Sequence, residues 1–174
     1  DNIITMISRA YLVPGDETVM ATPSFSQYKH NAKVEGATCV EVPLKDGTHD
    51  LEAMAAAITD KTKIVWVCNP NNPSGTIVTK SRLEQFLGKV PKHVLVVLDE
   101  AYCEYIDDEE YPNGLDYIGE YPNVIVLRTF SKAYGLAALR IGYGIGSPEV
   151  IRTINQVREP FNTTRISQAA ACAA

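Results

Sequence analysis

The sequence lacks the features that mark several classes of protein. It has no run of basic residues, and 21 acidic against 16 basic residues give a formal net charge of −5. We therefore expect neither nucleic acid nor an anionic membrane surface as a partner. Its apolar runs are far too short to span a membrane, and its first residues do not form the pattern of a signal peptide.

Cysteine and histidine are also scarce, and neither has the spacing of a metal site. The four cysteines form no CxxC pair; they are Cys39, Cys68, Cys103 and Cys172. This pattern is typical of reduced, buried thiols in a cytoplasmic protein. The three histidines, His30, His49 and His93, are expected to be surface or structural residues. The acidic run at 107–110 is expected to be a solvated loop, so we predict no metal ion.

A chain of 174 residues is long enough for one domain with a substantial core. Both ends have the pattern of a helix that continues beyond them: residue 1 is an aspartate directly before a helical pattern, and the last eight residues contain no Gly or Pro. The sequence therefore indicates an excised segment of a longer protein, with an active site that is only partly represented.

Short strand patterns alternate with helical patterns along the whole chain. Strands are predicted at 18–21, 38–42, 64–68, 94–98 and 124–127, and helices at 2–12, 25–35, 50–58 and 79–89. The strands at 64–68, 94–98 and 124–127 have no polar alternation, which is typical of strands buried on both faces of a parallel sheet. The alternation predicts an α/β fold in which helices flank a mostly parallel sheet.

Ligands of such sheets bind beyond the carboxyl ends of the strands. Polar segments follow three of the predicted strands: Asn69-Pro70-Asn71-Asn72-Pro73-Ser74-Gly75-Thr76, Asp99-Glu100-Ala101-Tyr102 and Arg128-Thr129-Phe130-Ser131-Lys132. Because these strand ends meet at one edge of the sheet, the three segments are expected to line one crevice.

The residue types in this crevice match the needs of pyridoxal phosphate. Lys132 could bind an aldehyde as a Schiff base, although an isolated lysine is more often a surface charge. Asp99 could pair with a pyridinium nitrogen, although an aspartate at a strand end can also be a helix N-cap. Thr129, Ser131 and Arg140 could hold a phosphate group.

The three segments, together with Arg140, resemble the signatures of fold-type I aminotransferases, and their order and spacing most resemble the histidinol-phosphate aminotransferase family. The likeness covers essentially all of residues 1–174. It implies a three-layer α/β fold with one antiparallel strand after the lysine loop, in which Gly142 and Gly144 fit. It also implies that residues 1–174 form most of the large, cofactor-binding domain, without the N-terminal arm and the C-terminal small domain.

The resemblance implies a role for each matching residue. Lys132 would carry the cofactor and act as general base and acid, and Asp99 would pair with the ring nitrogen. Asn72 and Tyr102 would hydrogen-bond the phenolate oxygen. The phosphate would be held by Thr129, Ser131 and Arg140.

Two aromatic residues and one proline complete the implied site. Phe25 would stack on the pyridine ring, with plain core packing as the alternative, and Tyr28 would lie behind Asp99. The Asn72-Pro73 bond would be in a tight turn with a cis peptide.

The activity implied by the resemblance is amino transfer from L-histidinol phosphate to 2-oxoglutarate, in a homodimer. The arginine that binds the substrate carboxylate and the tyrosine that comes from the partner subunit would lie outside this chain; Arg158 and Arg165 do not replace that arginine. Three alternatives stay open: an aromatic-amino-acid aminotransferase, a threonine-phosphate decarboxylase, and an aminotransferase-like sensor domain of a transcription regulator.

Overall fold

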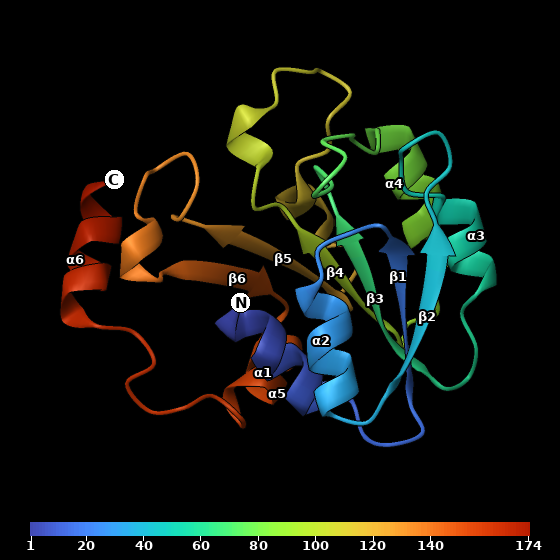
Figure 1. The fold of residues 1–174 in the computed structure, drawn as a ribbon, viewed down its shortest axis with the longest axis horizontal. Helices are drawn as coiled ribbons and strands as arrows, with labels where there is room; N and C mark the ends of the chain where they lie inside the picture. Colours follow the sequence, from blue (N-terminus) through green and yellow to red (C-terminus); the bar gives the residue numbers. More distant parts are fainter.

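A single six-stranded sheet forms the centre of the molecule in the computed structural model, which describes residues 1–174 (Figure 1). Its strands are β1 (Glu17–Thr22), β2 (Thr38–Pro43), β3 (Thr62–Cys68), β4 (Leu95–Asp99), β5 (Val124–Thr129) and β6 (Gly142–Gly146). Their order is β2-β1-β3-β4-β5-β6. Every pair is parallel except β5 with β6, which is antiparallel. The predicted sheet and its antiparallel strand after the lysine loop are confirmed.

Six α-helices accompany the sheet. They are α1 (Asn2–Tyr11), α2 (Gln27–Val34), α3 (Leu51–Ala56), α4 (Lys80–Leu87), α5 (Pro148–Asn155) and α6 (Arg165–Ala173). Short 3₁₀ helices lie at Cys103–Tyr105, Gly114–Tyr117 and Ala137–Leu139. The four predicted helices are confirmed with ends that differ by up to two residues. The sequence analysis did not predict α5, which begins at an N-cap serine whose side chain accepts from the Val150 amide.

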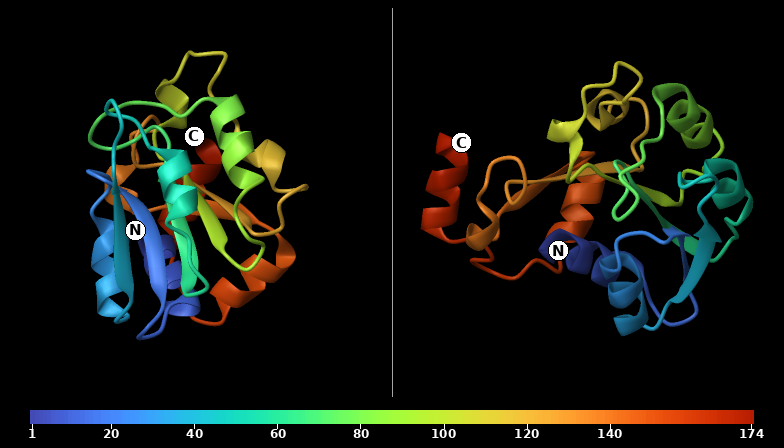
Figure 2. Two further views of the ribbon diagram at one scale, coloured as in Figure 1. Left: turned by 90° about the vertical axis from the view of Figure 1, so that its right-hand side faces the viewer. Right: turned by 45° about the horizontal axis from the view of Figure 1, so that its top comes forward.

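The helices form one layer on each face of the sheet (Figure 2, left). Alternate residues of β3 show why: Trp66 packs with α1, α2 and α5, whereas Val65 and Val67 pack with α3 and α4. A strand covered on both faces needs apolar residues at every position, which explains the continuous apolar run in β3. The α6 helix extends beyond the end of the sheet (Figure 1).

The order of the strands reverses next to β1. The chain passes from β1 to β2 on one side and then returns to place β3 on the other. The loops that follow β1 and β3 therefore diverge to opposite faces and leave a crevice between them, as expected at such a switch point. The Asn72–Pro73 bond in the second loop is cis, as the resemblance implied, and so are Thr22–Pro23 and Asn69–Pro70.

The cysteines correct one expectation. Only Cys68 is buried; Cys39 and Cys103 are partly exposed and Cys172 is exposed, because these three lie at an edge strand, a surface turn and the terminal helix. All four thiols are free. The acidic run at 107–110 is exposed, as predicted. None of the helices combines the length and the apolar character needed to cross a membrane.

Candidate active site

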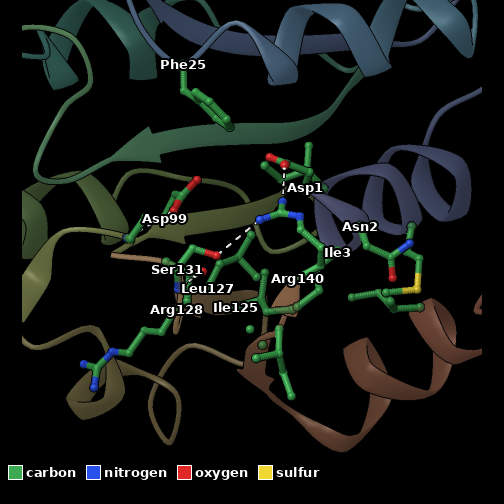
Figure 3. A pocket seen from close by; sticks show the side chains of 18 of the residues that line it. Asp1, Asn2, Ile3, Phe25, Asp99, Ile125, Leu127, Arg128, Ser131 and Arg140 are labelled. Atoms are coloured by element: carbon green, nitrogen blue, oxygen red, sulfur yellow. Dashed lines mark hydrogen bonds and ion pairs between the residues drawn. The ribbon is translucent and has the colours of Figure 1, made fainter. Parts of the chain in front are cut away.

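A cavity of about 710 Å³ lies at the carboxyl ends of the strands, beside the N-terminus of α1 (Figure 3). All eight residues predicted to bind the cofactor line it: Phe25, Asn72, Asp99, Tyr102, Thr129, Ser131, Lys132 and Arg140. They come from the last residues of β4 and β5, from the loops after β1, β3, β4 and β5, and from the turn before β6. The structure thus brings together segments that are more than 100 residues apart in the chain.

Asp99 is the buried acid of this cavity. It is the last residue of β4 and is only 7% exposed. Tyr28 Oη donates a hydrogen bond of 2.6 Å to Asp99 Oδ2, and the Ala101 amide donates to Oδ1 at 3.3 Å. Burial raises the pKa of Asp99, and the Tyr28 hydrogen bond opposes that rise. No lysine or arginine forms a salt bridge with it, and no helix begins there, so the N-cap alternative does not hold.

Tyr28 is held beneath Asp99 by an aromatic stack. Its ring stacks on Trp66 with 4.7 Å between centroids and meets the Phe25 ring edge-on at 5.6 Å. The Trp66 indole donates to Thr18 Oγ1 at 2.8 Å, so the stack has a fixed orientation. Burial raises the pKa of Tyr28 well above its usual value, which keeps its hydroxyl protonated as a donor. Tyr28 therefore lies behind Asp99, where the resemblance placed it.

Lys132 lies in the exposed loop after β5. Its Nζ is 5.1 Å from the centroid of the Tyr102 ring, so the ammonium group lies over the aromatic face. Asn72 Nδ2 donates to Tyr102 Oη at 3.4 Å, which joins the loop after β3 to the loop after β4. The amine, the phenol and the amide therefore share one wall of the cavity.

Arg140 lies at one end of the cavity, with Ser131 beside it (Figure 3). Arg140 Nη1 donates to Ser131 Oγ at 3.4 Å and to the Ala137 carbonyl at 3.0 Å, while Nη2 pairs with Asp1 Oδ2 at 2.9 Å. The Ser131 amide donates to Thr129 Oγ1 at 3.1 Å. A guanidinium, two hydroxyl groups and the N-terminus of α1 form a set of donors suited to a phosphate. The pairing with Asp1 was not predicted.

A buried ion pair beside the cavity was also missed by the sequence analysis. Arg128 Nε and Nη2 donate to Glu100 Oε2 at 2.9 and 2.8 Å, and the Gly114 amide donates to Oε1 at 2.7 Å. Arg128 consequently points away from Asp99 and Ser131 (Figure 3). The register of β4 and β5, which places Asp99 opposite Leu127, brings the two charged residues together. Both residues lie in the motifs quoted above, so the sequence offered a signal: opposite charges at the carboxyl ends of neighbouring strands.

The sequence analysis assigned no catalytic role to five further residues: the three histidines, Arg158 and Arg165. His49 is 1% exposed, which agrees with a structural role, whereas His30 and His93 are exposed. Arg158 lines the cavity, and its guanidinium donates to the side chains of Asn155 and Asn162. Arg165 begins α6 and is exposed.

Comparison with known proteins agrees with this geometry. The family model described as aminotransferase class I and II matches residues 1–174. The chain is 66% identical to a histidinol-phosphate aminotransferase of Brevibacillus brevis and 58% identical to that of Anoxybacillus flavithermus, over all of this chain and 48% and 47% of theirs. It spans about half the length of the curated relatives it matches.

Solved structures give the same result. The crystal structure of a histidinol-phosphate aminotransferase from Sinorhizobium meliloti in complex with pyridoxal-5'-phosphate has a TM-score of 0.92 at 35% identity, and the match covers 98% of this chain and 46% of that one. An L-threonine-O-3-phosphate decarboxylase from Porphyromonas gingivalis has the same fold, with a TM-score of 0.84 at 24% identity over 98% of this chain and 49% of its own. The chain therefore belongs to the class I and II aminotransferases.

Proposed function

We propose that the full-length protein is a pyridoxal-phosphate-dependent aminotransferase that transfers the amino group of L-histidinol phosphate to 2-oxoglutarate. The products are imidazole-acetol phosphate and L-glutamate, as in histidine biosynthesis. The observation that carries the reaction type is the buried carboxylate of Asp99, which has no cationic side chain as partner, in the same cavity as Lys132. The substrate assignment rests on the relatives that are 56–66% identical and share that name.

The residues of the cavity fit the cofactor. A buried carboxylate is costly unless it is paired, and a protonated pyridine nitrogen would supply the partner that Asp99 lacks. Arg140, Ser131 and Thr129 would hold the phosphate, and Asn72 and Tyr102 would hydrogen-bond the phenolate oxygen. Phe25 would cover one face of the ring. When bound, pyridoxal phosphate supplies an aldehyde and a ring that accepts electrons from the substrate.

The chain's own groups have distinct tasks in this reaction. Lys132 Nζ would hold the cofactor's aldehyde carbon, and would then take the proton from the substrate's α-carbon and return one during amino transfer. Asp99 would keep a proton on the ring nitrogen, and Tyr28 would keep Asp99 ionised by donating its hydroxyl hydrogen.

The organisation of the complete protein is part of the proposal. Residues 1–174 would form most of the large domain, and a smaller domain would supply the arginine for the substrate carboxylate. Phe161 and Ile166 are 97% and 73% exposed, which supports a further part of the protein covering this end. We infer that the full-length protein is a homodimer in the cytoplasm. Light scattering of the full-length protein tests the dimeric state.

The first test is a single-turnover absorption experiment on the full-length protein loaded with pyridoxal phosphate. Addition of L-histidinol phosphate without a keto acid should convert the cofactor spectrum to that of pyridoxamine phosphate. Lys132→Ala should show no such conversion. A spectrum that does not respond to L-histidinol phosphate would reject this substrate, and aromatic amino acids and threonine phosphate would be tried next.

A further inference from the structure

The side chain of Asn71 lies at a junction of hydrogen bonds next to the cavity and is 3% exposed. Its Oδ1 accepts from Ser24 Oγ at 2.8 Å, and His49 Nε2 lies 3.1 Å from the same oxygen. Its Nδ2 donates to the Pro23 carbonyl at 3.2 Å and to Ser74 Oγ at 2.8 Å. All four hydrogen-bonding positions of the amide are therefore used.

These contacts fix the protonation of His49. The Pro23 carbonyl only accepts, so the amide nitrogen of Asn71 must face it and the amide oxygen must face His49. His49 Nε2 consequently carries the hydrogen. Its Nδ1 is a buried acceptor without a hydrogen-bond partner. Burial lowers the pKa of His49, in keeping with a neutral ring.

The junction connects two walls of the cavity. Ser24 directly precedes Phe25 in the loop after β1, and Asn71 directly precedes Asn72 in the loop after β3. Phe25 and Asn72 both line the cavity. These are the loops that diverge at the reversal of strand order. Beyond the carboxyl ends of β1 and β3, the hydrogen bonds of the sheet therefore do not hold the two loops together.

His49 comes from outside the cavity, in the segment between β2 and α3, and its backbone is held from both sides. Thr76 Oγ1 donates to the Gly47 carbonyl at 2.7 Å, and Arg82 donates to the His49 carbonyl at 3.4 Å. Asp50 accepts from the Ala53 amide as the N-cap of α3. A change of the His49 side chain therefore leaves its loop anchored.

We propose that His49 is a positioning residue, which holds the Asn71 amide so that the Phe25 loop and the Asn72 loop keep their spacing around the bound cofactor. This inference rests on the proposed function, because it assumes that Phe25 and Asn72 contact pyridoxal phosphate. His49 acts through Asn71 and touches neither cofactor nor substrate.

The test compares three variants of the full-length protein. His49→Leu removes the hydrogen-bond donor to Asn71, whereas His49→Gln retains an N–H donor at a similar reach. Met54→Ala is the control: it opens a cavity beneath α3, the helix that follows His49, without touching Asn71. For each, one measures the dissociation constant of pyridoxal phosphate, the melting temperature, and the pH midpoint of the absorption change of the bound cofactor. That midpoint depends on the hydrogen bonds to the phenolate oxygen of the cofactor. A change in global stability alone leaves the midpoint unchanged.

We expect His49→Leu to weaken cofactor binding roughly tenfold and to raise the midpoint by about one pH unit, the effect of one lost hydrogen bond. His49→Gln should restore both values, and Met54→Ala should lower only the melting temperature. If His49→Leu lowers only the melting temperature, or if His49→Gln restores neither value, the positioning role is wrong.

Ser24→Ala keeps the inference testable if His49→Leu does not fold. It removes the other donor to Asn71 Oδ1 from a partly exposed position and should raise the midpoint as well. An unchanged midpoint in Ser24→Ala would overturn the proposal. Borohydride reduction of the wild type followed by peptide mapping separates this failure from that of the proposed function: absence of cofactor on Lys132 overturns both, whereas its presence leaves the variants to decide.

Discussion

Tyr28 Oη lies 2.6 Å from Asp99 Oδ2; both side chains are buried, and Asp99 lines the cavity while Tyr28 lies behind it. Asp99 thereby receives a neutral donor and keeps its charge free for a ligand. A lysine or arginine in the place of Tyr28 would have neutralised the carboxylate. The phenol of Tyr28 stabilises the ionised carboxylate by donating a hydrogen bond. Because the phenol is neutral, the negative charge of Asp99 stays available to pair with the cofactor.

Tyr28→Phe is expected to weaken cofactor binding by about tenfold or more, because a hydrogen bond to a charged group contributes about 1.5–3 kcal/mol. The pKa of Asp99 should rise further, since the Tyr28 hydrogen bond opposes the effect of burial. Cofactor titration of the full-length protein measures the effect. As a control, Tyr105→Phe changes an exposed tyrosine and should leave the dissociation constant unchanged; equal effects of the two changes would contradict this account.

Asp99→Asn is expected to raise the stability of the cofactor-free protein at pH 7.5 while it lowers turnover. Burial raises the pKa of Asp99, so the folded protein holds this proton more tightly than the unfolded chain. The contribution of Asp99 to stability is therefore present at low pH and is lost as the pH rises through the raised pKa. Without cofactor, the Asn variant should be more stable than the wild type at pH 7.5, and this difference should shrink as the pH falls.

The same variant should lose at least about 100-fold in turnover, because the ring nitrogen would lose its charged partner. Thermal unfolding of the cofactor-free protein at several pH values and steady-state kinetics provide the two measurements. A variant that is less stable at pH 7.5 and equally active would refute the proposed arrangement.

Arg128→Met is expected to lower the free energy of unfolding by about 3–5 kcal/mol, since it leaves Glu100 buried without its partner. The Glu100 side chain is only 3% exposed and that of Arg128 is 19% exposed. Lys89→Met is the matched control: it removes a pair with Glu52 whose side chains are 54% and 83% exposed. This exposed pair should contribute less than about 1 kcal/mol in denaturant unfolding. Similar losses for the two variants would show that burial of the pair does not matter.

Gly114→Ala is expected to destabilise the protein by about 1–3 kcal/mol through overpacking. A Cβ at Gly114 would overlap Glu100 Oε1 and would lie 2.8 Å from Val126 Cγ2. Gly119 provides the control, because a Cβ there has no atom within 4 Å and Gly119→Ala should be nearly neutral. Denaturant unfolding of both variants checks this; a neutral Gly114→Ala would mean that the Glu100 carboxylate is free to move.

The alternation of apolar strand patterns with helical patterns allowed the sheet to be predicted. Six of the eight cavity residues lie in the three motifs that follow strands, whereas Phe25 and Arg140 lie outside these motifs, and the role of Phe25 was implied only by the resemblance. The Glu100–Arg128 pair depends on the register between β4 and β5, which no pattern in a single sequence determines. The contact between His49 and Asn71 depends on a loop whose path is set by side-chain contacts with Thr76 and Arg82. Local patterns predict elements and their ends, whereas contacts between loops depend on the complete three-dimensional arrangement.

The cavity takes its lining from the ends of β1, β3, β4 and β5, from the turn before β6 and from β6 itself, so it is complete only after these five strands have assembled. A partly folded chain in which β5 and β6 have not paired holds Asp99 and Asn72 but lacks a fixed Lys132 and Arg140. The cofactor should then distinguish the native state from every incomplete form and stabilise it by mass action. Occupancy of this site would thus report on the completion of folding as well as on readiness for catalysis.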